Sequence, residues 1–428
     1  MIMITLQRVD QRNPFADYTG LRTIIGSSDN YKSVVQVIFY GILGTAVGWG
    51  TWGGGRDGWS MLLILLLPLA WGLSESRWAA SMLVFGYYLA GTRGLPGGAA
   101  VFFGYGAPWW YGWACWISVC VIVTAPLTVL WTTETKSRPW RFVAAICLSV
   151  IPPIGLVGWI NPISVAGTLY PGCGWAGAVL SLGVLAALVA RYDGWIGGLA
   201  GIAVVANLVS CIVVPKTPEG WVGANTHFPQ LSSSVGGDAG KMLAGIKRIE
   251  WVKTFVKTIP ANSVQVLPET VIGEYNGMSA FSLSDADDAL AARGSRLLVG
   301  AEVPQDGKYQ NSLVVLGAKN NEQKKAVQGI PVPISMWKPW TKSGAVADIW
   351  GHGNVIEVNG SRAGALICYE QLLPYSIFWM MVKKPDVIVA ASNVWWARET
   401  SIPAIQQQMV GVFGRLFGVP IVTAVNGL

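Results

Sequence analysis

The feature that most restricts the fold of this chain is an apolar first half in which charged residues are sparse. Between Ser33 and Val214 the few charged residues stand in short clusters, whereas beyond Lys216 they occur at ordinary frequency. Of the 428 residues, 12% are charged, against roughly 25% in a typical soluble globular protein. This change of composition near residues 215–220 predicts a membrane domain followed by a water-soluble domain.

The apolar half contains stretches of the length that membrane helices need, which is about 20 residues with roughly 17–25 tolerated. Seven stretches meet or approach this length: 34–52, 58–74, 78–92, 111–131, 142–160, 176–190 and 195–215. The glycine-rich stretch 97–108 is shorter and predicts a re-entrant or interfacial segment. We therefore expect an N-terminal segment (1–32), a polytopic α-helical membrane domain of about seven spans (33–215) and a soluble domain (216–428).

Lys and Arg residues are unequally shared between the two sets of loops that these spans would create. The basic residues of one set are Arg8, Arg12, Arg22, Lys32, Arg77, Lys136, Arg138, Arg141 and Arg191. The other set contains only Arg56 and Arg93. Because loops rich in Lys and Arg stay in the cytoplasm, we expect a cytoplasmic N-terminus and a soluble domain on the outer side. The basic residues of these loops explain the net charge of +7. The sequence contains no run of basic residues interleaved with aromatic ones, so it does not indicate nucleic-acid binding.

After Pro215, short apolar runs alternate with helical stretches, which favours a layered α/β domain. The predicted strands are Ser263–Leu267, Arg296–Gly300, Ser312–Leu316, Ala363–Ile367, Asp386–Ala390 and Ile421–Thr423. The predicted helices are Lys241–Ile259, Ser282–Arg293 and Ile402–Phe417.

Two polar groups follow directly after predicted strands and together could carry out chemistry. Glu269 stands after the strand from Ser263, and Cys368 after the strand from Ala363. A carboxylate can take the proton of a thiol so that the thiolate attacks a carbonyl carbon. Taken singly, each residue also fits a structural role, as a small buried cysteine or a solvated loop carboxylate. The cysteines form no metal-ligand pattern, and this chemistry requires neither a metal nor an organic cofactor.

Several motifs of the second half occur in the same order in a known family. They are NTHFPQ (225–230), LPET (267–270), DGKYQNS (306–312), VPISMWKP (332–339), ICYE (367–370), SNVWW (392–396) and VNG (425–427). The soluble half resembles the nitrilase (carbon–nitrogen hydrolase) superfamily, and the two-part architecture is similar to apolipoprotein N-acyltransferase. The chain as a whole resembles the TraB family of plasmid conjugal transfer proteins. The resemblance implies an α-β-β-α sandwich for residues 216–428, with a shorter C-terminal end than the acyltransferase.

The resemblance also implies residue roles, because the superfamily uses a Glu–Lys–Cys triad. Glu269 would be the general base, and Cys368 the nucleophile that forms a thioester with the acyl group. The family lysine falls on Gln328 if Val332-Pro333 aligns with the family motif, whereas a small shift would place it on Lys325. The implied pocket residues are Tyr369, Glu370, Asn393 and Trp395.

Two functions follow from this resemblance. The first is an acyltransferase or amide-directed enzyme at the bacterial inner membrane, with a periplasmic catalytic domain and a phospholipid or lipoprotein substrate. The second is a nitrilase-fold protein without turnover, whose pocket binds a lipid, peptide or protein of the conjugative apparatus. Glu269 and Cys368 favour the enzyme, whereas Gln328 in place of lysine favours the binding protein.

Overall fold

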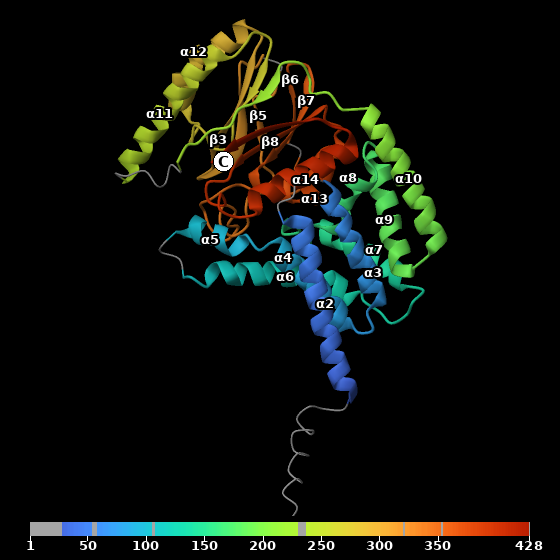
Figure 1. Ribbon diagram of the computed structural model, residues 1–428. Coiled ribbons are helices and arrows are strands. Elements are labelled where there is room, and N and C mark those ends of the chain that lie inside the picture. Colours follow the sequence, from blue (N-terminus) through green and yellow to red (C-terminus); the bar gives the residue numbers. More distant parts are fainter. Residues whose placement is uncertain are drawn as a thin grey trace, which may run out of the picture.

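The computed structural model describes residues 28–53, 58–104, 108–229, 237–319, 322–351 and 354–427. A helical first half carries an α/β second half on one side (Figure 1). The last helix of the first half ends at Ile212 and the first strand begins at Trp221, close to the predicted boundary. Most of the predicted N-terminal segment lies outside the described residues.

Helices lie at each of the seven predicted stretches. In chain order the first half contains α2 (Ser28–Trp52), η2 (Gly58–Leu65), α3 (Leu66–Leu73), α4 (Arg77–Gly91), α5 (Leu95–Phe103), α6 (Tyr111–Val129), α7 (Arg138–Val150), η3 (Ile154–Leu156), η4 (Pro162–Val165), α8 (Ala166–Leu169), α9 (Gly174–Ala190) and α10 (Asp193–Ile212). Three of these are long and apolar enough to cross a bilayer, namely Lys32–Trp52, Tyr111–Val129 and Asp193–Ile212. A fourth would result if Pro162–Leu169 and Gly174–Ala190, which meet at 119°, formed one broken span.

The predicted stretch 142–160 differs from a single helix. The helix α7 ends at Val150, and Ile151 is extended. Pro152 and Pro153 follow, and proline has no N–H to continue a helical hydrogen-bond ladder. The chain then turns into η3, η4 and α8, whose residues are largely buried. The segment after Val150 therefore forms short, largely buried turns and does not continue α7 as a straight span.

The second half contains two sheets. The strands of the first sheet are β1 (Trp221–Gly223), β2 (Val264–Val266), β3 (Arg296–Gln305), β4 (Lys308–Leu316) and β5 (Lys325–Val327), in that order. The strands of the second are β6 (Val355–Val358), β7 (Ser361–Ile367), β8 (Val387–Asn393) and β9 (Ile421–Asn426). The pairs β1–β2, β2–β3, β7–β8 and β8–β9 are parallel, and the other pairs are antiparallel.

The two sheets face each other, and a pair of helices covers the outer side of each. Apolar residues of both sheets, such as Val266 and Val389, form one buried cluster. The helices α11 (Gly237–Thr258) and α12 (Gly277–Ala292) cover the first sheet. The helices α13 (Pro374–Val382) and α14 (Ile402–Phe417) cover the second. The layers thus follow the α-β-β-α order that the resemblance implies.

The first half packs closely against the second sheet's helices. Buried side chains of the first half, such as Trp71 and Ile163, belong to the same apolar cluster as Met409 and Phe413 of α14. The Gln408 side chain donates a hydrogen bond to the Thr51 carbonyl at 3.1 Å. The two halves therefore share one core.

Candidate active site

Cys368 lies at a strained turn directly after β7. Its φ is +50°, in the left-handed region that non-glycine residues adopt at an energetic cost. A short 3-10 helix, η6 (Cys368–Leu372), begins at this residue. The Cys368 carbonyl accepts a hydrogen bond from Gln406 Nε2 of α14 at 3.0 Å. The turn thus sets the thiol at the carboxyl end of the parallel strands, where α/β proteins commonly place reactive groups.

Glu269 follows β2 and meets the thiol from the other sheet. Its side chain is 4% exposed and lies close to the Cys368 thiol, with which it lines one cavity. It also accepts hydrogen bonds from Asn311 Nδ2 at 2.5 Å and from the Asn393 backbone N–H at 3.0 Å. Gly300 on β3 leaves room for the Glu269 backbone, since a Cβ at position 300 would lie 2.5 Å from the Glu269 Cα. Glu269 and Cys368, predicted separately from two strand ends, are therefore direct neighbours.

The surroundings change the acidity of both groups. Burial raises the pKa of Glu269 to about 7, although its hydrogen bonds act in the opposite direction. Burial, and next the charge of Glu269, raise the pKa of the Cys368 thiol well above its usual range. The proton therefore rests on sulfur, while the carboxylate has the acidity that suits a base near neutral pH.

Gln328 occupies the space between Glu269 and the nucleophile's strand. It follows β5, is fully buried, and accepts a hydrogen bond from Asn311 Nδ2 at 2.9 Å. Its own amide donates to the Ile367 carbonyl at 2.7 Å. Lys325, the other position considered for the family lysine, instead donates to Gln310 Oε1 at 2.6 Å. The structure thus brings Gln328, and not Lys325, to the Glu269–Cys368 pair.

Asn311 joins this site without having been predicted. It is fully buried, and its side-chain amide bridges Glu269 and Gln328. Its Oδ1 has no hydrogen-bond partner among the described residues. The residue lies inside the DGKYQNS motif, so the motif contained the signal that could have identified it.

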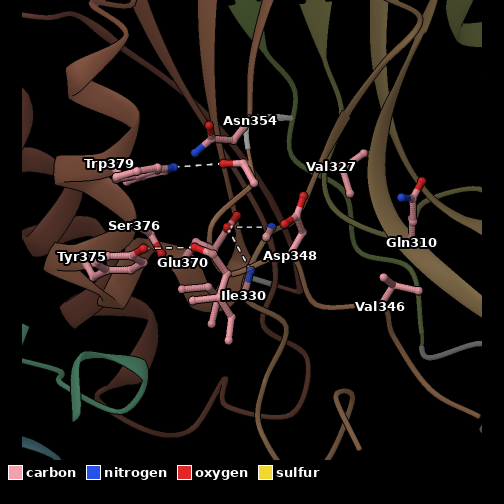
Figure 2. Close-up of a pocket in the computed structure, with 13 residues that line it drawn as sticks. Gln310, Val327, Ile330, Val346, Asp348, Asn354, Glu370, Tyr375, Ser376 and Trp379 are labelled. Atoms are coloured by element: carbon pink, nitrogen blue, oxygen red, sulfur yellow. Dashed lines mark hydrogen bonds between the residues drawn. The ribbon is translucent and has the colours of Figure 1, made fainter. Parts of the chain in front are cut away.

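Glu370 binds the backbone of the nucleophile turn and does not line the cavity that contains the thiol. It accepts hydrogen bonds from the backbone N–H groups of Ile367, Gly329 and Ile330 at 3.1, 2.9 and 3.3 Å. Figure 2 shows it at a neighbouring cavity of about 240 Å³, which Asp348 also lines. Burial raises the pKa of Glu370 to about 8. Glu370 thereby fastens the nucleophile turn to the residues that follow Gln328.

Tyr369 points away from the thiol and toward the first half. Its hydroxyl donates to the Leu156 carbonyl at 2.8 Å, and its ring centroid lies 5.9 Å from that of Trp159. Of the four residues expected in the pocket, Asn393 and Trp395 line the Cys368 cavity, whereas Tyr369 and Glu370 do not.

The Cys368 cavity is large and lies at the junction of the two halves. It has a volume of about 760 Å³. Its lining includes Phe102, Met242, Ile246, Glu269, Glu274, Met278, Glu302, Tyr309, Met336, Cys368, Asn393, Trp395 and Trp396. Phe102 of α5 stacks on Trp395 at 6.2 Å, so the first half closes one wall. The arrangement combines an apolar wall with a thiol–carboxylate pair, which fits attack on the carbonyl of an acyl group with apolar parts.

Positive charge near this cavity comes from α11. Among the residues that the structure describes, Lys241 and Arg248 are the lining cations. The Arg248 guanidinium is bound to the backbone carbonyls of Thr270, Val271 and Pro229. Within the same described ranges, no three His, Cys, Asp or Glu side chains gather as a metal site.

Comparison with known proteins places these observations in a family. No family model matches the chain. A conjugal transfer protein TraB from Agrobacterium fabrum is 32% identical over 419 residues, which cover 92% of this chain and 93% of that protein. A probable conjugal transfer protein TraB from Sinorhizobium fredii is 32% identical over 395 residues, or 87% of this chain and 95% of that protein.

Two of the solved structures similar to this chain each cover about half of its length. A mutant amidase of the nitrilase superfamily from Nesterenkonia shares 13% identity with a TM-score of 0.33, over 49% of this chain and 78% of that one. A carbon–nitrogen hydrolase from Helicobacter pylori shares 13% identity with a TM-score of 0.34, over 48% of this chain and 72% of that one.

Proposed function

The chain belongs to the TraB family of conjugal transfer proteins, and on this premise we propose that it is a membrane-anchored acyltransferase or amide-directed enzyme acting through Cys368. One observation carries the proposal: the buried Glu269 carboxyl and Cys368 thiol lie close together on the wall of one cavity of about 760 Å³. A buried thiol with a structural role alone needs neither a carboxylate partner nor a cavity. The apolar wall of the cavity favours a phospholipid or lipoprotein acyl group as the substrate.

The proposed reaction needs only groups present in the chain and the substrates. Glu269 takes the thiol proton while sulfur attacks the acyl carbonyl carbon, and the resulting tetrahedral intermediate expels the alcohol or amine leaving group. That leaving group takes the proton from Glu269, and Cys368 is left as a thioester. An acceptor amine or water then attacks the thioester and gives a proton to Glu269, which returns it to the departing thiolate.

The neutral residue at position 328 affects the expected speed of this reaction. A tetrahedral oxyanion is stabilised by donors held in place beforehand, and losing one such donor costs roughly 10²–10³ in rate. The Gln328 amide is already bonded to the Ile367 carbonyl at 2.7 Å, and it has no charge. We therefore expect a slow enzyme.

The proposed location follows from the apolar helices and the basic loops. The three long apolar helices and the helices packed against them form the anchor. The larger share of Lys and Arg lies in the N-terminal segment and in alternate loops, which by the positive-inside rule belong in the cytoplasm. The α/β half is then periplasmic, at the inner membrane of the bacterial cell, beside the conjugative apparatus.

A mass measurement tests the proposed chemistry. Full-length protein is incubated with phosphatidylethanolamine–phosphatidylglycerol vesicles, and intact mass spectrometry then searches for an acyl adduct that hydroxylamine removes. We expect this adduct in the native protein and not in Cys368→Ala. Cys211→Ala serves as the control, because Cys211 is an exposed cysteine on α10. Absence of the adduct from the native protein, with unchanged plasmid transfer by Cys368→Ala cells, contradicts the enzyme.

The second candidate is a protein that uses the cavity only for binding a partner of the conjugative apparatus. Gln328 favours it, because both ends of its amide are already hydrogen-bonded. This function requires the cavity but not the thiol. It therefore predicts normal transfer with Cys368→Ala and reduced transfer when the cavity is filled, for example by Asn393→Phe.

A further inference from the structure

The residue next to the nucleophile ties it to the first half of the chain. The Tyr369 hydroxyl donates a hydrogen bond of 2.8 Å to the Leu156 carbonyl. Its ring packs against Trp159 with an angle of 60° between the ring planes. Tyr369 is 6% exposed and Trp159 is 4% exposed. A buried contact of this kind links residues 213 positions apart in the sequence.

The Cys368 backbone needs such support. Its φ of +50° is a conformation that a non-glycine residue keeps only when its surroundings hold it there. The second support is the hydrogen bond from Gln406 to the Cys368 carbonyl. Gln406 lies on α14, whose Gln408 in turn donates to the Thr51 carbonyl of the first half. These two supports lead to the first half, whereas Glu370 holds the turn from within the second half.

The segment that receives Tyr369 is itself held in place. Residues 151–161 connect α7 to η4 through short turns. Asn161, which is fully buried, donates to Ser149 Oγ at 2.7 Å and accepts from the Ile163 N–H at 3.0 Å. A contact to a segment fixed in this way limits the movement of Tyr369.

From this geometry we propose that Tyr369 is a positioning residue through which the first half holds Cys368 in its left-handed turn and against Glu269. The N-terminal half is then part of the active site's framework as well as a membrane anchor. A shift of the loop at Leu156 and Trp159, such as binding of another protein to the first half could produce, would change the reactivity of Cys368. The proposal rests on the proposed function only in taking Cys368 as the reactive group.

The experiment measures the reactivity of Cys368 in full-length protein as a function of pH. Iodoacetamide alkylates the protein in detergent from pH 6 to 10.5, and the modified Cys368 peptide is quantified by mass spectrometry. Tyr369→Phe removes only the hydroxyl. The matched control is Tyr375→Phe, because the Tyr375 hydroxyl also donates to a backbone carbonyl, that of Ile349, at 3.1 Å.

We expect Tyr369→Phe to shift the alkylation profile of Cys368 to lower pH. Once the turn relaxes, the thiol moves from the buried position beside Glu269, and its pKa returns toward that of an ordinary cysteine. Each unit of that change gives about tenfold more thiolate below the pKa, so alkylation at pH 8 should rise about tenfold or more. Tyr375→Phe should keep the native profile. Loss of stability alone, with the turn intact, would lower the melting temperature without moving the profile.

A second variant keeps the test decisive if Tyr369→Phe does not fold. Trp159→Phe retains a ring at the contact and should shift the profile in the same direction. Native profiles in the folded variants, or the same shift in Tyr375→Phe, overturn the proposal. The absence of an acyl adduct with a shifted profile would instead reject acyl transfer and retain the positioning role.

Discussion

At the scale of single residues, neighbours in the sequence at the nucleophile have different surroundings in space. Cys368, Tyr369 and Glu370 are consecutive, but they face the Glu269 cavity, the first half and a second cavity, respectively. Successive residues of a 3-10 turn project about a third of a turn apart, so a motif cannot state which of them lines a pocket. Glu269 and Cys368 were predictable because each follows an apolar strand. Asn311 was not singled out, because only its place inside the DGKYQNS motif distinguishes it from any other core polar residue.

The residue at position 328 determines the charge of the site, and a substitution there tests this. Gln328→Lys would place an ammonium near Asn311 Oδ1, a buried acceptor without a partner among the described residues, and near Glu269. A nearby cation favours the ionised form of a carboxyl or thiol. Glu269 must be ionised to act as a base, so native acylation should rise as pH increases through about 7. In Gln328→Lys this rise should move to lower pH.

The control for this substitution is Lys325→Gln, which alters the other position considered for the family lysine. Because Lys325 bonds to Gln310, its loss should leave the pH dependence of adduct formation unchanged. The measurement is the initial rate of adduct formation from pH 5 to 9, beside a melting curve for each variant. If Lys325→Gln moves the pH dependence and folded Gln328→Lys does not, then Lys325 supplies the functional charge.

At the scale of elements, long periodic segments were predictable and most short ones were not. Each of the six predicted strands contains or overlaps a strand, and the three predicted helices correspond to α11, α12 and α14. The strands β1, β5 and β6 were not predicted, because three or four residues seldom show an alternating pattern. The strand β2 is as short, but its apolar run continues to Leu267. The proline pair after α7 breaks a stretch whose composition alone resembles a span.

The helix α14, which contacts the active site through Gln406, packs on α8. A glycine of α8 makes this close packing possible. A Cβ at Gly167 would lie 1.7 Å from the Val412 carbonyl oxygen. Gly167→Ala should therefore force α14 away and lower the free energy of unfolding by about 1–3 kcal/mol. Because α14 carries Gln406, the alkylation of Cys368 should change as well.

Gly411→Ala provides the matched comparison on α14 itself. A Cβ at Gly411 meets no atom within 4 Å, and alanine in a helix is more favourable than glycine by about 0.5–1 kcal/mol. Thermal unfolding of full-length protein in detergent should give a lower midpoint for Gly167→Ala and an equal or higher one for Gly411→Ala. Equal changes of the unfolding midpoint in the two variants would show that the close α8–α14 contact does not determine the stability of the protein.

At the scale of the whole molecule, composition predicted a boundary between two halves but gave no indication of their contact. Charge frequency changes within the interval from Ile212 to Trp221 that separates the last helix from the first strand. The shared cluster that joins Trp71 to Phe413 is built from residues that look equally suited to lipid or to protein. The apolar character of a side chain does not reveal whether it packs against lipid or protein. The sequence therefore predicted an anchor and a separate domain, and not a shared core.

The orientation of the whole molecule predicts which positions an impermeant reagent can reach. Asp288 on α12 and Lys136 between α6 and α7 are both exposed. With the native exposed cysteines replaced by serine, Asp288→Cys should react with a sulfonated maleimide in intact spheroplasts. Lys136→Cys should react only after the membrane is permeabilised. The two variants are controls for each other, and the reverse pattern would invert the proposed topology.

The core shared by the two halves also has a consequence for biogenesis. The ribosome makes the helical half first, so the face that receives α14 exists before α14 is synthesised. In the proposed topology, the α/β half then completes its folding on a platform that is already inserted in the bilayer. A chain that carried a foreign anchor would leave the buried faces of Met409 and Phe413 in water. The two halves are therefore expected to be inherited together and not to be exchanged as separate modules.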